Sequence, residues 1–291
     1  MRFEFIHAEK ANYPITVLCS VMCVSRSGYY RWRDSTPSER KRTEERRTLA
    51  VRAIHVESRC TYGSPRVCAV LRKRGETITP KTVAKIMKNE GLAVRPKRKF
   101  KATTDSRATK RIAPNVLKRD FTTDAPNKVW VTDVTAFWTA AGWCFLAAML
   151  DLFSRRVVGW EMTESNDTHL ALAAFNNAIN SRRPTGSLLH HSDRGSPYGS
   201  DDYIAALDSH GVARSMSRKG DCWDNAVAES FFATIEHELR SKHSFATPAQ
   251  ARAAVKSYIE DFYNPQRIHS TLGNQSPIEF ELIFTSNKQA A

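Results

Sequence analysis

The chain has 291 residues, which is enough for two domains that each bury a core of their own. Its formal net charge of +14 is unevenly spread, because residues 1–120 hold 29 Lys and Arg against 11 Asp and Glu, whereas residues 121–291 hold 15 against 19. The basic first part indicates a polyanionic partner, with nucleic acid favoured over a merely solubilising surface.

Cysteine usage and hydropathy predict a reducing compartment. The six cysteines form no CxxC pair and have no His partner at zinc-finger spacing, so we expect no zinc site. The sequence shows no signal peptide and no apolar run of membrane-spanning length. We therefore expect a cytoplasmic protein.

Residues 1–94 are predicted to be a helical DNA-binding region of the helix-turn-helix type. Apolar residues at helical spacing predict a short helix over 15–23, and Ser25 is a candidate cap of a second helix. A strongly charged helix is predicted over 37–56. For the first of these segments, a small packing subdomain with surface arginines is an equally good interpretation.

Two later helices complete the helix-turn-helix prediction. The first spans 66–74 and stops at Gly75, while Thr79 caps the second, which begins at Pro80 and runs to Glu90. The second helix has three lysines on one face, which we expect to contact DNA: Lys81, Lys85 and Lys88. Base recognition does not follow from lysines, because phosphate contacts position a protein without specifying sequence.

Residues 95–120 are predicted to be a basic linker that also follows DNA, with a tether that binds nothing as the alternative. Eight Lys and Arg residues within 95–115 favour the DNA-binding interpretation. The candidate contacts in this stretch are Arg95, Lys97, Arg98, Lys99 and Lys101.

Residues 121–291 are predicted to be an α/β catalytic core with a C-terminal helical extension. Apolar, β-branched runs predict strands, and segments of helical periodicity alternate with the later ones. The expected strands are 129–137, 144–151, 157–162, 187–192 and 213–217. The expected helices are 168–179, 201–209, one around Glu229, and 248–262. This order describes a mixed sheet flanked by helices.

Three carboxylates in this core are candidates for a divalent-metal site. Asp133 and Asp193 each close an apolar run that predicts a buried strand, and Glu229 lies on a helix. An oxygen-only ligand set suits a hard cation such as Mg²⁺. A single Asp at a strand end is more often a turn former or a helix cap, so the combination carries the hypothesis.

The motifs VTDVT, HSDRGSPYGS and DNAVAESFF resemble the integrase core of DDE transposases, with thirty-five residues between Asp193 and Glu229. The upstream TYGSPRV and KIMKNEGL and the final YNPQRIHSTLGNQSPIEFE narrow the resemblance to the second-frame protein of the insertion sequence three family of bacterial elements. The similarity spans almost the whole chain.

This resemblance implies a ribonuclease H-like fold and a DNA transposase with Asp133, Asp193 and Glu229 as catalytic and metal-binding residues. It implies two Mg²⁺ or Mn²⁺ ions, strand cleavage at element ends, and strand transfer by a freed 3′-hydroxyl. The implied partners are the terminal inverted repeats, target DNA, further copies of the chain, and an upstream-frame protein, bound or fused. A bacterial protein at the nucleoid is expected when DNA is bound.

Two other functions stay open at this point. A related metal-dependent nuclease would share the carboxylates but would not join strands. An element-encoded DNA-binding regulator would use the basic region without catalysis. The basic first part and the final motif disfavour the nuclease, and the intact carboxylate set disfavours the regulator.

Three residues near the carboxylates have predicted roles other than metal binding. Asp151 is expected to hydrogen-bond the turn at Ser154 and Arg155 rather than bind metal. Arg218 and Lys219 are candidate phosphate contacts.

Predictions also follow for the start and the far side of the Glu229 helix. Asp224 and Asn225 are expected to cap this helix. Glu236 stands where the family commonly has a basic residue, so any contact of that helix face with DNA must use other groups. The final motif supplies three residues that either contact DNA phosphate or position the active-site helix: Tyr263, Arg267 and His269.

Overall fold

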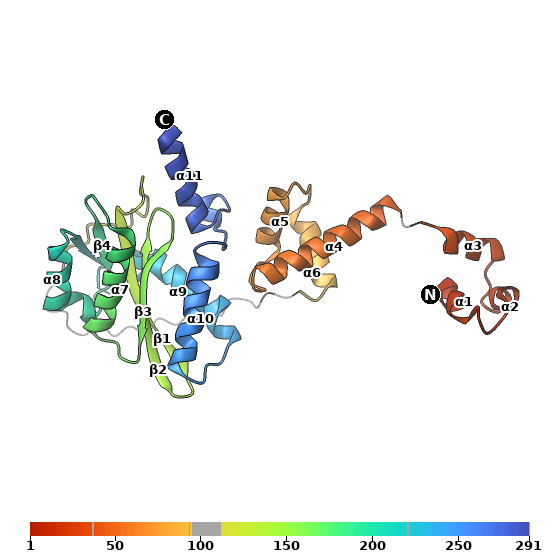
Figure 1. Cartoon of the computed structure of the whole chain (residues 1–291), viewed down its shortest axis with the longest axis horizontal. Coiled ribbons are helices and arrows are strands. Elements are labelled where there is room, and N and C mark those ends of the chain that lie inside the picture. Colours follow the sequence, from red (N-terminus) through yellow and green to blue (C-terminus); the bar gives the residue numbers. More distant parts are fainter. Residues whose placement is uncertain (37, 93, 95–111, 220, 291) are drawn as a thin grey trace. The chain divides into compact units, whose positions relative to one another are not determined.

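The computed structural model describes residues 1–36, 38–92, 94, 112–219 and 221–290. The chain folds as two compact units, Met1–Ile54 and His55–Ala291, which are described separately. The elements are labelled in Figure 1. The predicted boundaries at 94 and 120 stay predictions.

The first unit is helical. Its first three helices pack around Ile6, Leu18, Cys19 and Tyr29, which are all buried. Ser25 caps the third helix, because its side chain accepts a hydrogen bond from the Gly28 amide, and this confirms the predicted cap. The helices are α1 (Arg2–Glu9), α2 (Ile15–Val21), α3 (Arg26–Asp34) and α4 (Glu39–Glu57), of which α1 was not predicted.

The predicted helix pair opens the second unit. Helix α5 (Ser64–Lys73) and helix α6 (Pro80–Asn89) lie close to the expected boundaries. The Thr79 hydroxyl accepts a hydrogen bond from the Thr82 amide at 3.2 Å, which confirms Thr79 as the cap of α6. Apolar residues on the inner faces of both helices are buried: Val67, Cys68, Leu71, Val83, Ile86 and Met87.

A five-stranded mixed sheet forms the centre of the second unit, in the order β3-β2-β1-β4-β5. The first three strands pair antiparallel, and β4 and β5 run parallel to β1. This confirms the predicted mixed sheet. The strands are β1 (Val129–Thr139), β2 (Gly142–Asp151), β3 (Val157–Thr163), β4 (Leu189–Ser192) and β5 (Ala213–Met216).

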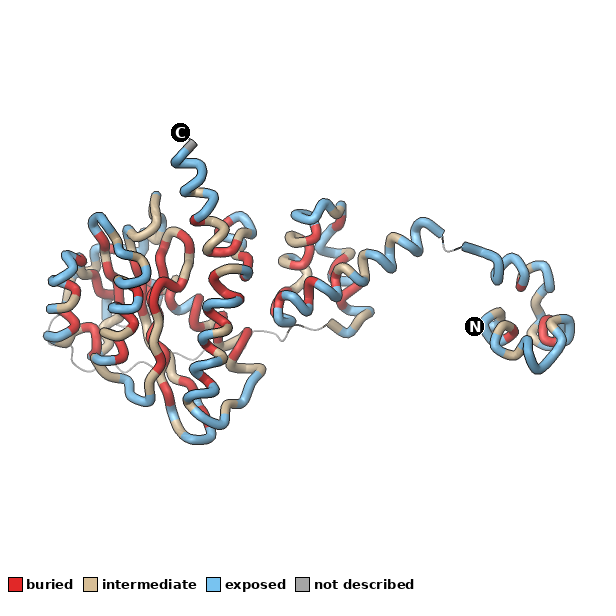
Figure 2. Tube along the Cα trace, viewed as in Figure 1, coloured by how far each residue is buried: buried red, intermediate tan, exposed pale blue. Residues whose placement is uncertain are grey.

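Helices cover the sheet, and the core lies between them and the strands, as the buried positions in Figure 2 show. The α-helices are α7 (Thr168–Arg182), α8 (Asp201–Ser209), α9 (Ala226–Glu238), α10 (Pro248–Ser257) and α11 (Pro277–Ala290). The predicted helix over 248–262 is confirmed as far as Ser257, after which the chain continues as a π-helix. The short helices are η1 (Ser196–Gly199), η2 (Cys222–Asn225), η3 (Arg240–Lys242), the π-helix η4 (Tyr258–Tyr263) and η5 (Ser270–Leu272).

The segment before β1 packs along the edge of the sheet. The amide of Val116 donates to the Ser215 hydroxyl at 3.0 Å, and Leu117 is buried. Residues 112–120 of the predicted linker therefore contact the catalytic core.

Helix α11 was not predicted. Its Glu281 carboxylate accepts hydrogen bonds from Arg156 at 2.8 Å and from Arg182 at 2.9 Å. These arginines belong to the start of β3 and the end of α7, so an ion-pair cluster fixes α11 to the core. No helix within the described residues is both long and apolar enough to cross a bilayer.

Candidate active site

Asp133 lies in the middle of β1, opposite Ala148 of β2. It is half-buried, and its Oδ1 accepts a hydrogen bond from the Val134 amide at 2.8 Å. Burial raises the pKa of Asp133 to about 8, and the negative charges of Asp193 and Glu229 add to the rise. Carboxylates can perturb one another in this way only if they lie near one another.

Asp193 follows the last residue of β4, the parallel neighbour of β1. Its Oδ1 accepts a hydrogen bond from the Gly195 amide at 2.8 Å. A Cβ at Gly195 would lie 2.9 Å from this oxygen, so a larger residue there would displace the Asp193 carboxylate. Burial raises the pKa of Asp193.

Glu229 lies in the first turn of α9 and is exposed. Burial of its carboxylate and the charge of Asp193 raise its pKa. The structure thus brings Asp133, Asp193 and Glu229 into one electrostatic neighbourhood. Among the described residues, however, no three His, Cys, Asp or Glu side chains are already arranged to hold a metal ion.

Two hydrogen bonds fix α9 against β1. The Asn225 side-chain amide donates to the Thr132 carbonyl at 3.0 Å, and the Arg240 guanidinium donates to the Ala136 carbonyl at 3.1 Å. The prediction that Asn225 caps α9 is wrong, because its side chain makes no cap hydrogen bond. Asn225 instead ties the start of the Glu229 helix to the residue before Asp133.

Asp224 also does something other than cap the helix. Its buried carboxylate accepts hydrogen bonds from Arg218 at 2.9 Å, Arg119 at 2.8 Å and Asn115 at 2.8 Å. The Arg218 hydrogen bond leads the interactions that hold the pKa of Asp224 well below its usual value. Arg218 is exposed but paired with Asp224, and the neighbouring Lys219 is exposed as well.

The histidines before Asp193 are structural. His190 accepts or donates a hydrogen bond with the Tyr203 hydroxyl at 3.0 Å, and His191 contacts the hydroxyls of Ser215 and Ser217. Burial lowers the pKa of His190 to about 3 and that of His191 to about 4. Both rings are neutral at physiological pH, and as consecutive strand residues they pack on opposite faces of β4.

Asp151 is a structural residue, as predicted, but its donors differ from those expected. Its carboxylate accepts hydrogen bonds from the amides of Asn127 at 2.6 Å and Phe153 at 2.9 Å, and Arg182 lies 3.7 Å away. The expected turn does form, because the Arg155 amide donates to the Asp151 carbonyl.

Arg267 is almost completely buried. Its side chain is 4% exposed and donates two hydrogen bonds to Glu238, the last residue of α9, at 2.8 Å and 2.6 Å. The direct DNA contact predicted for Arg267 stays a prediction, but the guanidinium already serves Glu238. Of the two predicted roles, the geometry favours positioning of the active-site helix.

The remaining predicted DNA contacts divide into two groups. Lys81, Lys85 and Lys88 are exposed on α6, as the helical spacing predicted. The five linker residues lie outside the described part of the chain: Arg95, Lys97, Arg98, Lys99 and Lys101.

Family models match most of the chain. An integrase core domain model matches residues 123–222, a second integrase core domain model matches 210–277, and an HTH-like domain model matches 41–100. Transposase InsF for insertion sequence IS3A from Escherichia coli (strain K12) is 37% identical over 97% of this chain and 98% of its own length. The chain belongs to the IS3 family of transposases. The predicted family, ribonuclease H-like fold class and polynucleotidyl transferase class are confirmed.

The chain is also similar to a second curated protein and to solved integrase structures. The insertion element IS600 uncharacterized 31 kDa protein from Shigella sonnei is 42% identical over 90% of this chain and 97% of its own length. The HTLV-2 integrase catalytic core domain, solved in complex with magnesium, covers 54% of this chain and 98% of that chain at 15% identity, with a TM-score of 0.42. A simian T-cell lymphotropic virus intasome covers 79% of this chain and 73% of that chain at 14% identity, with a TM-score of 0.45.

Proposed function

We propose that this IS3-family chain cuts DNA at insertion-element ends and joins the freed 3′-hydroxyl to target DNA, with Asp133, Asp193 and Glu229 as its catalytic residues. The observation that carries the proposal is the proximity of these three carboxylates: burial is the main cause that raises the pKa of Asp133 to about 8, and the charges of Asp193 and Glu229 add to it. The two hydrogen bonds that tie α9 to β1 support it, because they hold Glu229 beside the strand of Asp133.

The donor set fits divalent metal. The three side chains offer only oxygen, and burial together with mutual repulsion disfavours their charged forms, which a cation would reverse. Asp133, Asp193 and Glu229 would hold two Mg²⁺ or Mn²⁺ ions. When bound, such ions polarise the scissile phosphate and lower the pKa of the attacking water.

The protein's own groups supply the positioning. The Gly195 amide orients the Asp193 carboxylate, and the Val134 amide orients that of Asp133. Asn225 holds the start of α9 against β1, and Glu229 lies in the first turn of this helix. Preorganised ligands of this kind reduce the entropic cost of binding a phosphodiester in a reactive orientation.

The helix-turn-helix-like region supports DNA as the partner. Lys81, Lys85 and Lys88 form an exposed basic face on α6 that suits a phosphate backbone. The substrates in this proposal are the terminal inverted repeats and target DNA. Pairing of two element ends would require several copies of the chain at the nucleoid, with an upstream-frame protein fused or bound.

Strand-transfer products from labelled element-end DNA test the proposal. Wild type in Mg²⁺, alone or fused to the upstream-frame segment, should give joined product, and Glu229→Gln should bind DNA without joining it. Cleavage without joining would favour a nuclease. Binding alone, with or without the fusion, would favour a regulator.

A further inference from the structure

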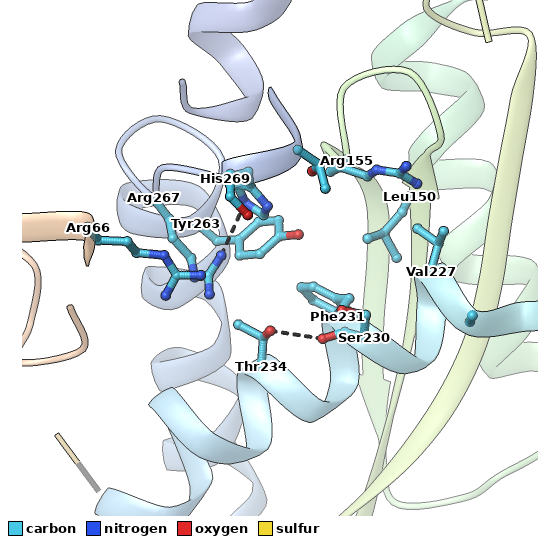
Figure 3. Close-up of a pocket in the computed structure, with 13 residues that line it drawn as sticks. Arg66, Leu150, Arg155, Val227, Ser230, Phe231, Thr234, Tyr263, Arg267 and His269 are labelled. Atoms are coloured by element: carbon cyan, nitrogen blue, oxygen red, sulfur yellow. Dashed lines mark hydrogen bonds between the residues drawn. The ribbon is translucent and has the colours of Figure 1, made fainter. Parts of the chain in front are cut away.

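A pocket of about 280 Å³ lies on the side of α9 that faces the final motif. Its wall includes Ser230 and Thr234 of α9, Arg66 of α5, and Arg155 of the β2–β3 turn, as Figure 3 shows. The volume lies just below the roughly 300–1,000 Å³ of pockets for drug-sized ligands, so the pocket suits a small group. The exposed Thr271 also lines it, so its opening reaches the surface.

The charges around this pocket do not balance. Three arginines line it, Arg66, Arg155 and Arg267, and the carboxylate of Glu238 serves two of them. Glu238 pairs with Arg267 at 2.6 Å and with Arg66 at 3.6 Å. The lining therefore has three positive charges against the one negative charge of Glu238. Burying a cation without a counter-charge is costly, so this excess favours an anionic ligand.

Arg155 supplies this excess. Its Nη1 is buried and has no hydrogen-bond partner among the described residues. Burial lowers the pKa of Arg155, which reflects the cost of its charge in this place. The residue has a left-handed backbone with φ of 62°, which is uncommon for a residue other than glycine.

The positive charges of the arginines also act on His269. Burial lowers its pKa to about 3, and the charges of the three arginines add to the effect. The neutral ring lies 3.4 Å from an Arg267 nitrogen and can therefore accept a hydrogen bond from it. The charge of Asp151 also acts on Arg155, but the Asp151 carboxylate is already held by the amides of Asn127 and Phe153. Several donors around one small space, with the nearby carboxylates engaged by other groups, are the features of an oxyanion site.

We propose that this pocket binds a phosphate group, either a phosphodiester of DNA or free inorganic phosphate, with Arg155 as its main unpaired donor. The DNA case rests on the proposed function. The pocket joins α5 of the helix-turn-helix-like pair to α9, which carries Glu229. A DNA phosphate held in this pocket would therefore link DNA binding by the α5–α6 pair to the position of α9.

Inorganic phosphate tests the site without any reaction. Calorimetric titration of the full chain with phosphate, at an ionic strength held constant with chloride, should show binding that Arg155→Gln weakens at least about tenfold. Arg155→Lys keeps the charge and should retain part of the affinity. Arg183→Gln is the matched control, because Arg183 is an exposed, left-handed residue (φ 43°) that does not line the pocket.

Element-end DNA with one neutral methylphosphonate at each position in turn identifies the source of the phosphate. If the ligand is DNA, a methylphosphonate at one position should lower the DNA affinity of wild type about tenfold or more. The same methylphosphonate should not lower the DNA affinity of Arg155→Gln any further. If inorganic phosphate binding depends on Arg155, but no methylphosphonate position has an effect that depends on Arg155, the ligand is free phosphate.

The proposal is overturned if Arg155→Gln matches Arg183→Gln in both phosphate and DNA titrations. Failure of the proposed function would look different. In that case the Arg155-dependent phosphate binding would persist while wild type gave no joined product.

Discussion

Arg267 and Glu238 form a bidentate ion pair at the end of α9, with both side chains no more than 4% exposed. The Tyr258 hydroxyl donates a third hydrogen bond to the same carboxylate at 2.8 Å. Burial alone would raise the pKa of Glu238, but the hydrogen bonds and charge of Arg267 hold it below its usual value. The final motif thus fixes one end of the helix that carries Glu229 at the other.

Glu238→Gln should destabilise the fold by about 3–5 kcal/mol, because it leaves Arg267 buried without its counter-charge. Urea unfolding at pH 7 measures this change. Glu236→Gln is the matched control, since Glu236 forms an exposed pair with Arg240 worth less than about 1 kcal/mol. Equal losses in the two variants would refute the structural role of Glu238.

The same ion pair predicts a pH dependence. The folded-state pKa of Glu238 is lowered, so its stabilising contribution is present above the unfolded-state pKa and is lost as pH falls through the folded-state value. Wild type should therefore lose more stability than Glu238→Gln between about pH 5 and pH 3. Parallel stability curves for the two proteins would count against this assignment.

Asp133 should affect stability with the opposite pH dependence. Its pKa is raised from 3.8 to about 8, so the folded state retains a proton that the unfolded state releases above about pH 4. Without divalent cation, wild type should lose stability as pH rises from about 4 to 8. Asp133→Asn should then be more stable than wild type at pH 8 by more than about 1 kcal/mol.

Thermal unfolding with and without Mg²⁺ checks this prediction. Mg²⁺ should stabilise wild type at pH 8 and should stabilise Asp133→Asn much less. If Asp133→Asn is destabilised at pH 8 without cation, the account of its burial is incorrect.

Gly159 of β3 allows α7 to approach the sheet. A Cβ there would lie 2.5 Å from the Ala178 amide nitrogen, with little freedom for the backbone to move. Gly159→Ala should cost about 1–3 kcal/mol in urea unfolding. Gly186→Ala is the control, because nothing lies within 4 Å of the added Cβ, and a comparable loss there would exclude close packing as the cause.

The exposed lysines of α6 should contribute to DNA affinity through phosphate contacts. Lys85→Gln should weaken binding of all sequences to a similar extent and lower the slope of log K against log salt by about 1. Fluorescence anisotropy at several salt concentrations measures both values. Lys256→Gln is the control, because the exposed Lys256 of α10 carries the same charge. An identical slope in both variants would argue against a phosphate contact by α6.

The sequence was sufficient to predict much of this fold, because its signals are local. Thr79 and Pro80 mark the start of α6, and the β-branched run from Val129 predicts β1. Helix α8 (Asp201–Ser209) lies at the predicted bounds. The convergence of Asp133, Asp193 and Glu229 was predicted by resemblance to a family rather than by periodicity.

Tertiary partners were not predictable in this way. Asn225 precedes a helix, which favours a cap, yet its amide reaches a β1 carbonyl that only the folded sheet brings near. Arg267 is a basic residue in a polar motif, and its burial depends on Glu238, twenty-nine residues earlier. Arg155 has a left-handed backbone and an unpaired buried nitrogen that no sequence pattern indicated.

The measurement that most directly tests the central claim is the yield of joined DNA product as a function of Mg²⁺ concentration for wild type, Glu229→Gln and Glu236→Gln. Both variants remove one carboxylate from α9, but only Glu229 raises the pKa of Asp133. We expect wild type and Glu236→Gln to join DNA and Glu229→Gln to bind DNA without joining it. Joining by Glu229→Gln at the wild-type rate would contradict the account.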